Sequence, residues 1–191
     1  NQTCVAWFDG EAVDRNTDME SILAGDWKSL SLVDGSFCCA VYDKGNGRLT
    51  VTNDRMGLRP LYLVNTSSYF AYAAEVKALV AIAERLPQID RVSLRQFFCF
   101  GYMLGDRTWW EGVSMLAPAS VLEVSKVAYQ HRRYWTFDRV AVAHEREVDV
   151  HERLRALWQA AIERRTRAGV TPVLLSGGLD SRLVLAELHR Q

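Results

Sequence analysis

The sequence has no excess of charge and no long apolar run. Its 191 residues carry 23 basic and 23 acidic side chains, so no net field draws the chain towards nucleic acid or a lipid surface. No apolar stretch reaches the roughly 18 residues that a membrane-spanning helix needs, and the first residues do not lead us to expect a signal peptide. These absences predict that the partners include neither nucleic acid nor a membrane.

Cysteine and histidine are scarce, and neither is spaced like a metal site. The four cysteines, Cys4, Cys38, Cys39 and Cys99, match no zinc motif and no disulfide framework, and the four histidines show no metal spacing. Cys38 and Cys39 are neighbours in an apolar run that favours a strand, so we expect them to be buried on opposite faces of it. Reduced thiols of this kind are typical of a reducing compartment, which predicts a cytoplasmic protein.

The most informative motif is a glycine turn, Ser176-Gly177-Gly178-Leu179-Asp180-Ser181. It follows the apolar run Val173-Leu174-Leu175 and precedes a helix-like run from Arg182 to Leu188. Two glycines let the backbone approach an anion closely, and a helix N-terminus presents unpaired N–H groups at the positive end of its dipole. The pattern predicts a buried strand, a phosphate-binding turn and the start of a helix.

This motif differs from the two commonest phosphate loops. It has no Gly-Lys-Ser/Thr ending, and it lacks the third glycine of the dinucleotide fingerprint. The pattern SGGxDS resembles the PP-loop of the ATP pyrophosphatases, which release pyrophosphate while they form an adenylate. The resemblance implies an ATP site formed by Leu174, Leu175, Ser176, Gly177, Gly178, Asp180 and Ser181. Within it, the backbone of Leu174 and Leu175 would lie near the adenine, and Asp180 would hold the accompanying Mg²⁺. The alternative is an ordinary strand-to-helix turn of small residues.

The region before this motif reads as antiparallel strands with a few short helices. Strands are expected over residues 4–8, 36–43, 48–53, 61–65, 69–73, 119–124 and 129–134, and helices over 18–23, 75–82 and 94–100. The pair Asn46-Gly47 between two of these strands is a strong hairpin signal. After a polar linker at 136–147, apolar residues at helical spacing from Val150 to Ile162 predict a long amphipathic helix.

Three segments of this region carry a second resemblance. Residues 35–43 resemble the GxFAxxxYD strand of class II glutamine amidotransferases, residues 53–62 their RDRxGxxPLY segment, and residues 74–79 their SExKAL segment. In this order, and followed by a PP-loop, they resemble the glutamine-hydrolysing asparagine synthetase family.

The family resemblance implies two domains. Residues 1–135 would form an α+β domain of the N-terminal-nucleophile (Ntn) hydrolase type, with antiparallel sheets sandwiched by helices. Residues 148–191 would begin an α/β PP-loop domain, similar to the adenine nucleotide alpha hydrolases. The family's nucleophile is an N-terminal cysteine that is activated by its own α-amino group. Cys4 is not expected to be this residue, because it lies too close to Asp9-Gly10-Glu11, which aligns with a family Asn-Gly-Glu far downstream of the first residue. The nucleophile is expected upstream of Asn1, and the chain is therefore expected to be an inactive fragment.

The same resemblance implies a glutamine site with one unusual residue. In the family, the Asn side-chain amide and the Gly backbone build the oxyanion hole; here these positions are Asp9 and Gly10. A carboxylate cannot donate a hydrogen bond as an amide does, so the oxyanion hole is expected to be impaired unless Asp9 only caps a strand end. Glu11 and Asp18 match positions that help to hold the α-amino group of glutamine.

Three charged residues of the second matching segment are expected to be structural. Asp54 and Arg55 lie beside Gly57 and Pro60 and are expected to stabilise a tight turn, and Arg59 is expected to be a packing or turn residue.

These resemblances imply an ATP-dependent, amide-forming ligase of the asparagine synthetase type. It would adenylate a carboxylic acid such as aspartate with MgATP and aminate it with ammonia from glutamine. One alternative is a PP-loop ligase with a degenerate amidotransferase domain that uses an internal amine to close a β-lactam or a macrocycle. Another is a non-catalytic nucleotide-binding or scaffolding protein. Whether the protein forms a homodimer is left open.

Overall fold

The computed structural model describes residues 4–13, 29–137, 146–166 and 171–190 of the chain. The chain divides into two compact units, Asn1–Asp138 and Arg139–Gln191. Each unit is described separately below. None of the helices within the described ranges is both long and apolar enough to cross a membrane.

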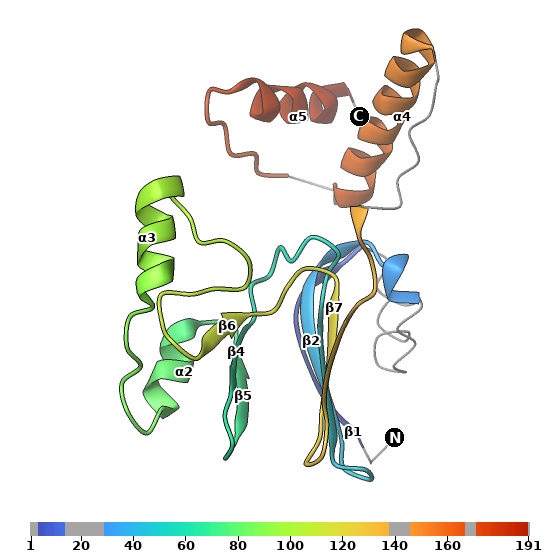
Figure 1. Cartoon of the computed structure of the whole chain (residues 1–191). Coiled ribbons are helices and arrows are strands. Elements are labelled where there is room, and N and C mark those ends of the chain that lie inside the picture. Colours follow the sequence, from blue (N-terminus) through green and yellow to red (C-terminus); the bar gives the residue numbers. More distant parts are fainter. Residues whose placement is uncertain (1–3, 14–28, 138–145, 167–170, 191) are drawn as a thin grey trace. The chain divides into compact units, whose positions relative to one another are not determined.

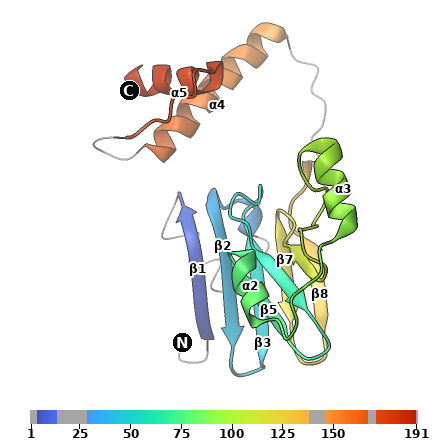
Figure 2. The ribbon, with the colours of Figure 1, turned by 90° about the vertical axis from the view of Figure 1, so that its left-hand side faces the viewer.

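The first unit contains a five-stranded antiparallel sheet with the strand order β1-β2-β3-β7-β8. Figure 2 shows β1, β2 and β3 side by side, with β7 and β8 beyond them. Its strands are β1 (Cys4–Ala12), β2 (Gly35–Asp43), β3 (Arg48–Asn53), β7 (Ser120–Val124) and β8 (Tyr129–Arg133). The hairpin predicted around Asn46-Gly47 is confirmed, because β2 and β3 pair directly on either side of it.

A second, three-stranded antiparallel sheet has the order β5-β4-β6. Its strands are β4 (Tyr62–Asn65), β5 (Phe70–Ala73) and β6 (Val113–Met115), and the helical elements of the unit are η1 (Ser29–Ser31), α2 (Val76–Ile82) and α3 (Arg91–Phe100). Helix α2 contacts β4 and β5 on the side of this sheet that faces away from the larger one (Figure 1). Two stacked antiparallel sheets fit the Ntn-hydrolase type expected for this part of the chain.

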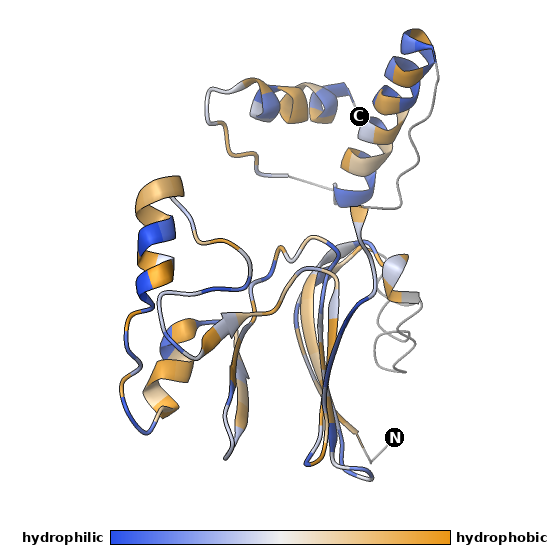
Figure 3. Cartoon of the chain, viewed as in Figure 1, coloured by the Kyte–Doolittle hydropathy of each residue, from blue (hydrophilic) through white to orange (hydrophobic). Residues whose placement is uncertain are grey.

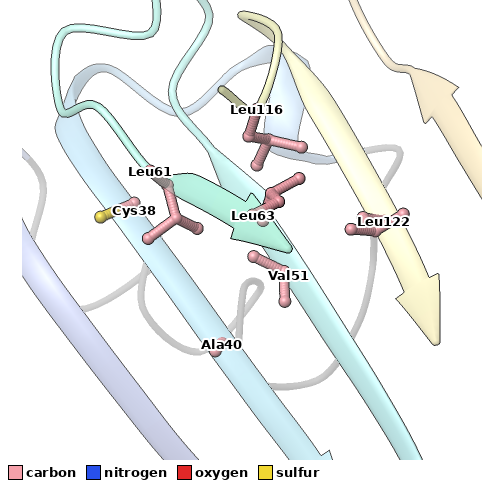
Figure 4. Packing of buried hydrophobic residues seen from close by; sticks show 7 residues of the cluster. All are labelled: Cys38, Ala40, Val51, Leu61, Leu63, Leu116 and Leu122. Carbon is pink, nitrogen blue, oxygen red and sulfur yellow. The ribbon is translucent and has the colours of Figure 1, made fainter. Parts of the chain in front are cut away.

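The middle of the larger sheet is buried on both faces, as the alternation of side chains along β2 shows. Cys38 and Ala40 point into a cluster between the two sheets, whose other members are Val51, Leu61, Leu63, Leu116 and Leu122 (Figure 4). Phe37 and Cys39 point to the opposite face, where they pack with Leu30, Val33 and Val121. The prediction that Cys38 and Cys39 are buried on opposite faces is therefore confirmed, and both are free thiols.

The second unit contains two helices, α4 (Glu147–Arg165) and α5 (Leu179–Arg190). The long helix predicted from the apolar spacing is confirmed, and polar and apolar residues alternate along it (Figure 3). The strand predicted at Val173-Leu174-Leu175 is wrong: these residues form no strand, and Leu174 is 95% exposed. A strand needs a hydrogen-bonded neighbour, and no described strand pairs with this segment. The helix predicted at 18–23 lies outside the described residues.

Candidate functional site

Asp9 and Gly10 lie on β1, the edge strand of the larger sheet. Their partners on β2 are Cys38 and Phe37. Residues that oppose each other in an antiparallel pair project to the same face, so Asp9 shares the face of Cys38, which is turned towards the smaller sheet. Strand β1 continues beyond Asp9 to Ala12, so the alternative that Asp9 merely ends a strand is wrong.

Gly10 occupies a position that no side chain can fill. Its φ angle is +123°, and a Cβ atom built on it would lie 2.1 Å from the carbonyl oxygen of Ser36. Only glycine adopts this conformation without strain while leaving room for the neighbouring strand. The protein therefore presents bare backbone next to the Asp9 carboxylate.

Asp9 has a cationic partner, Arg59. The Arg59 Nη1 and Asp9 Oδ2 atoms are 3.8 Å apart, and the two side chains are 43% and 41% exposed. Arg59 lies in a bend of the chain, so its predicted role as a packing or turn residue stays a prediction, and the ion pair with Asp9 is an additional contact. Nothing in the sequence spacing links two residues that are fifty positions apart, since Arg59 comes from the loop between β3 and β4. The fold alone brings them together.

Asp54 fixes the start of the loop that carries Arg59. This carboxylate is 2% exposed. It accepts hydrogen bonds from the backbone N–H groups of Phe37 at 3.2 Å, Met56 at 2.9 Å and Leu58 at 3.0 and 3.2 Å. Arg55 instead pairs with Asp34 at 3.9 Å. The predicted structural role of Asp54 in a tight turn is confirmed, and the loop is tied to β2 one residue from the partner of Asp9.

Neither Cys38 nor Cys4 is suited to act as a nucleophile beside Asp9. Burial raises the pKa of the Cys38 thiol to about 11, the negative charges of Asp9 and Asp54 raise it too, and Arg59 opposes them. Cys38 is therefore protonated near neutral pH and shielded from solvent. Cys4 is exposed but lies five positions before Asp9, about 17 Å along an extended strand.

Of the two residues expected to hold the α-amino group of glutamine, only Glu11 lies within the described residues. Glu11 lies on β1 opposite Ser36 and is exposed. Asp18 lies outside the described residues, so its role stays a prediction.

The glycine turn of the second unit is exposed and internally hydrogen-bonded. Gly177 has a φ angle of +82°, the Ser181 hydroxyl lies 3.2 Å from the Gly178 carbonyl, and the Ser176 and Ser181 hydroxyls are 3.3 Å apart. Arg182 donates to the carbonyl oxygens of Gly177 at 2.6 Å and Gly178 at 3.3 Å. The sequence reasoning did not single out Arg182, which adds a cation to the turn. Asp180 lies in the first turn of α5 and is exposed.

No group of three or more histidine, cysteine or acidic side chains is close enough to hold a metal ion within the parts of the chain that the structure describes. A Mg²⁺ ion bound at Asp180 would take further ligands from phosphate oxygens and water.

Comparison with known proteins identifies the first unit. Residues 8–135 match the family described as "Glutamine amidotransferase domain". The chain belongs to this family. The antiparallel sheets and the Asp9-Gly10 edge described above therefore belong to a glutamine amidotransferase domain.

The sequence relatives of this amidotransferase chain are asparagine synthetases. It is 30% identical over 188 residues to "Asparagine synthetase [glutamine-hydrolyzing] 3" of Bacillus subtilis. This match covers 93% of this chain and 30% of the relative. It is also 30% identical over 193 residues to the glutamine-hydrolysing asparagine synthetase of Cricetulus griseus, covering 92% of this chain and 32% of the relative. The predicted kinship with this family is confirmed, and the chain spans about a third of the length of these relatives.

Among solved structures, glutamine phosphoribosylpyrophosphate amidotransferase from B. subtilis, complexed with ADP and GMP, is 14% identical with a TM-score of 0.43. That comparison covers 98% of this chain and 44% of the other.

Proposed function

We propose that the protein is an ATP-dependent, amide-forming ligase of the asparagine synthetase type, in which the amidotransferase domain supplies ammonia from glutamine. One observation carries this proposal. The similarity to an asparagine synthetase covers 93% of the chain, so it extends beyond residues 8–135 into the second unit, which is the unit that carries the SGGLDS turn. A protein that only hydrolysed glutamine would not be expected to share sequence with an asparagine synthetase beyond the amidotransferase domain.

The turn of the second unit has groups that suit the ATP-dependent step. A carboxylate such as aspartate attacks the α-phosphorus of ATP, and pyrophosphate leaves. The backbone of Gly177 and Gly178 and the hydroxyls of Ser176 and Ser181 are at the N-terminal end of α5, where N–H groups and the helix dipole stabilise anions. Asp180 would hold the Mg²⁺ that accompanies the nucleotide, and Leu174 and Leu175 would lie beside the adenine. Catalysis at this turn is then mainly the positioning of phosphates and the neutralisation of their charge.

Asp9 favours a second candidate function. A carboxylate at the amide position of the oxyanion hole suits a ligase whose amidotransferase domain has degenerated and which takes its amine from within its own substrate. This candidate keeps the ATP chemistry of the second unit and loses the glutaminase of the first.

Product analysis of the full-length protein tests both candidates. With glutamine, aspartate and MgATP, the proposed function yields glutamate, AMP, pyrophosphate and asparagine. AMP without glutamate would support the internal-amine ligase. Glutamate without AMP, or neither product, would refute an aspartate-dependent ligase. Glutamate formation would refute the internal-amine candidate, which is defined by the loss of the glutaminase.

Asp180→Asn tests the ATP site directly. The amide removes a negative charge that a divalent cation needs, so pyrophosphate release should fall by more than about tenfold. The control is Asp149→Asn on α4, which makes the same chemical change in an exposed carboxylate paired with Arg146 at 2.7 Å and should leave the rate unchanged. If Asp180→Asn stays within about threefold of the wild type, a barrier change under about 0.7 kcal/mol, Asp180 does not hold the metal.

A further inference from the structure

The negative charge of Asp9 is unfavourable for glutamine hydrolysis, and the ion pair with Arg59 offsets that charge. When a nucleophile attacks the side-chain amide of glutamine, negative charge develops on the amide oxygen. A carboxylate near that oxygen repels it and donates no hydrogen bond. Asp9 by itself would therefore oppose glutamine hydrolysis at this site.

Arg59 places a permanent positive charge beside this carboxylate. The ion pair is loose, at 3.8 Å, and both side chains remain partly open to solvent, at 43% and 41% exposure. A guanidinium group has five N–H donors, so holding one carboxylate oxygen leaves others available for a second anion. The loop carrying Arg59 is anchored through Asp54, which limits how far the cation can move away.

We propose that Arg59 is a catalytic residue of the glutaminase reaction and donates to the oxyanion in place of the amide that Asp9 lacks. This inference rests on the proposed glutaminase function. In the step concerned, a cysteine thiolate forms a C–S bond with the amide carbon, and the π electrons of the C=O bond move to the oxygen. Arg59 and the Gly10 N–H stabilise that charge. The carbonyl then re-forms as the C–N bond breaks, and the departing nitrogen takes a proton from the protonated α-amino group.

Two other roles for Arg59 predict different kinetics. If Arg59 bound the α-carboxylate of glutamine, its loss would raise KM and leave kcat nearly unchanged, because ground state and transition state would lose the same interaction. If the ion pair were only structural, its loss would change little, since exposed pairs contribute little to stability. An oxyanion donor acts in the transition state alone, so its loss lowers kcat.

A double-mutant cycle in the full-length protein tests the proposal. The proteins are wild type, Asp9→Asn, Arg59→Met and the double variant, with glutamate production measured against glutamine concentration. In the protein that retains Asp9, Arg59→Met should lower kcat by about a hundredfold, the usual effect of one oxyanion donor. In the protein that already carries Asp9→Asn, the Asn amide donates the hydrogen bond instead. There, Arg59→Met should lower kcat by less than about threefold. Arg59→Lys should restore part of the lost kcat, because it keeps the charge with fewer donors.

The control variant is Arg48→Met. It removes an arginine of β3 that pairs with Glu123 of β7 at 3.7 Å, and it should leave glutamate production unchanged. Equal losses of kcat with and without Asp9→Asn, or a change confined to KM, would overturn the role of Arg59 while leaving the glutaminase intact. If none of the four proteins, including Asp9→Asn, forms glutamate, the glutaminase function itself is wrong and the role of Arg59 with it.

Discussion

Asp54 is the single residue on which the loop between β3 and β4 depends most. Its two oxygens are used differently: Oδ1 accepts from Met56 and Leu58, and Oδ2 accepts from Phe37 and Leu58. Every partner is a backbone donor, so both atoms must be acceptors. A buried group of this kind can be replaced only by another with acceptors at both positions.

Asp54→Asn should therefore destabilise the protein although it preserves the shape of the side chain. In either orientation, the new NH₂ group faces backbone N–H donors, and at least one of them is left without an acceptor. The expected loss in the free energy of unfolding is about 2–4 kcal/mol, measured by urea denaturation. Asp43→Asn is the control, because its carboxylate accepts one exposed backbone hydrogen bond, from Gly45 at 2.8 Å, and should cost under about 1 kcal/mol. Equal losses in the two variants would show that burial is not what makes Asp54 important.

At this scale, the sequence predicted residues whose role is local. Asp54 lies next to the turn that it stabilises, and Cys38 and Cys39 lie in one strand whose alternation fixes their faces. The ion pair of Arg59 was not predicted, because its partner Asp9 belongs to a distant strand and no local pattern encodes such a pair. Long-range ion pairs of this kind depend on the register of the sheet and the path of a loop.

At the scale of elements, the close approach of β1 and β2 at Gly10 is the feature that shapes the site. Gly10 and Gly47 both have positive φ angles, +123° and +65°. Only Gly10 has a neighbour in the way, since nothing lies within 4 Å of a Cβ atom at Gly47. The two glycines thus separate the effect of backbone conformation from the effect of strand contact.

Substitution by alanine at these two glycines should reveal that difference. Gly47→Ala is expected to cost about 1–2 kcal/mol, the usual penalty for a side chain in this conformation. Gly10→Ala is expected to cost about 3–5 kcal/mol, because the Ser36 carbonyl must also move away. Urea denaturation of both variants measures the two losses. A loss at Gly10 no larger than that at Gly47 would mean that β1 and β2 separate easily at this end.

The elements that the sequence predicted correctly are those with their own turn signals or long periodic runs. Both hairpins and helix α4 belong to this class. Strand β6, Val113–Met115, was missed because three residues are too few to show alternation. The strand expected at Val173-Leu174-Leu175 was predicted from apolarity alone, but a strand forms only where a neighbouring strand supplies its hydrogen bonds.

At the scale of the whole molecule, the two proposed reactions use residues of different compact units. Asp9, Gly10 and Arg59 belong to residues 1–138, and the SGGLDS turn belongs to residues 139–191. The first unit has its own core on both faces of the larger sheet. We therefore expect a substitution at one site to leave the chemistry of the other intact.

Crossing the variants with two nitrogen sources tests this division in the full-length protein. Arg59→Met should lower asparagine formation from glutamine but leave it unchanged when ammonia is supplied, because ammonia bypasses the oxyanion step. Asp180→Asn should lower pyrophosphate release with either nitrogen source, while glutamate production continues, because glutamine hydrolysis needs no ATP. Asparagine, glutamate and pyrophosphate are measured in the same reactions. If Asp180→Asn stops glutamate production as completely as pyrophosphate release, glutamine hydrolysis depends on an occupied ATP site. The two sites would then be coupled, and nucleotide binding in the second unit would activate glutamine hydrolysis in the first.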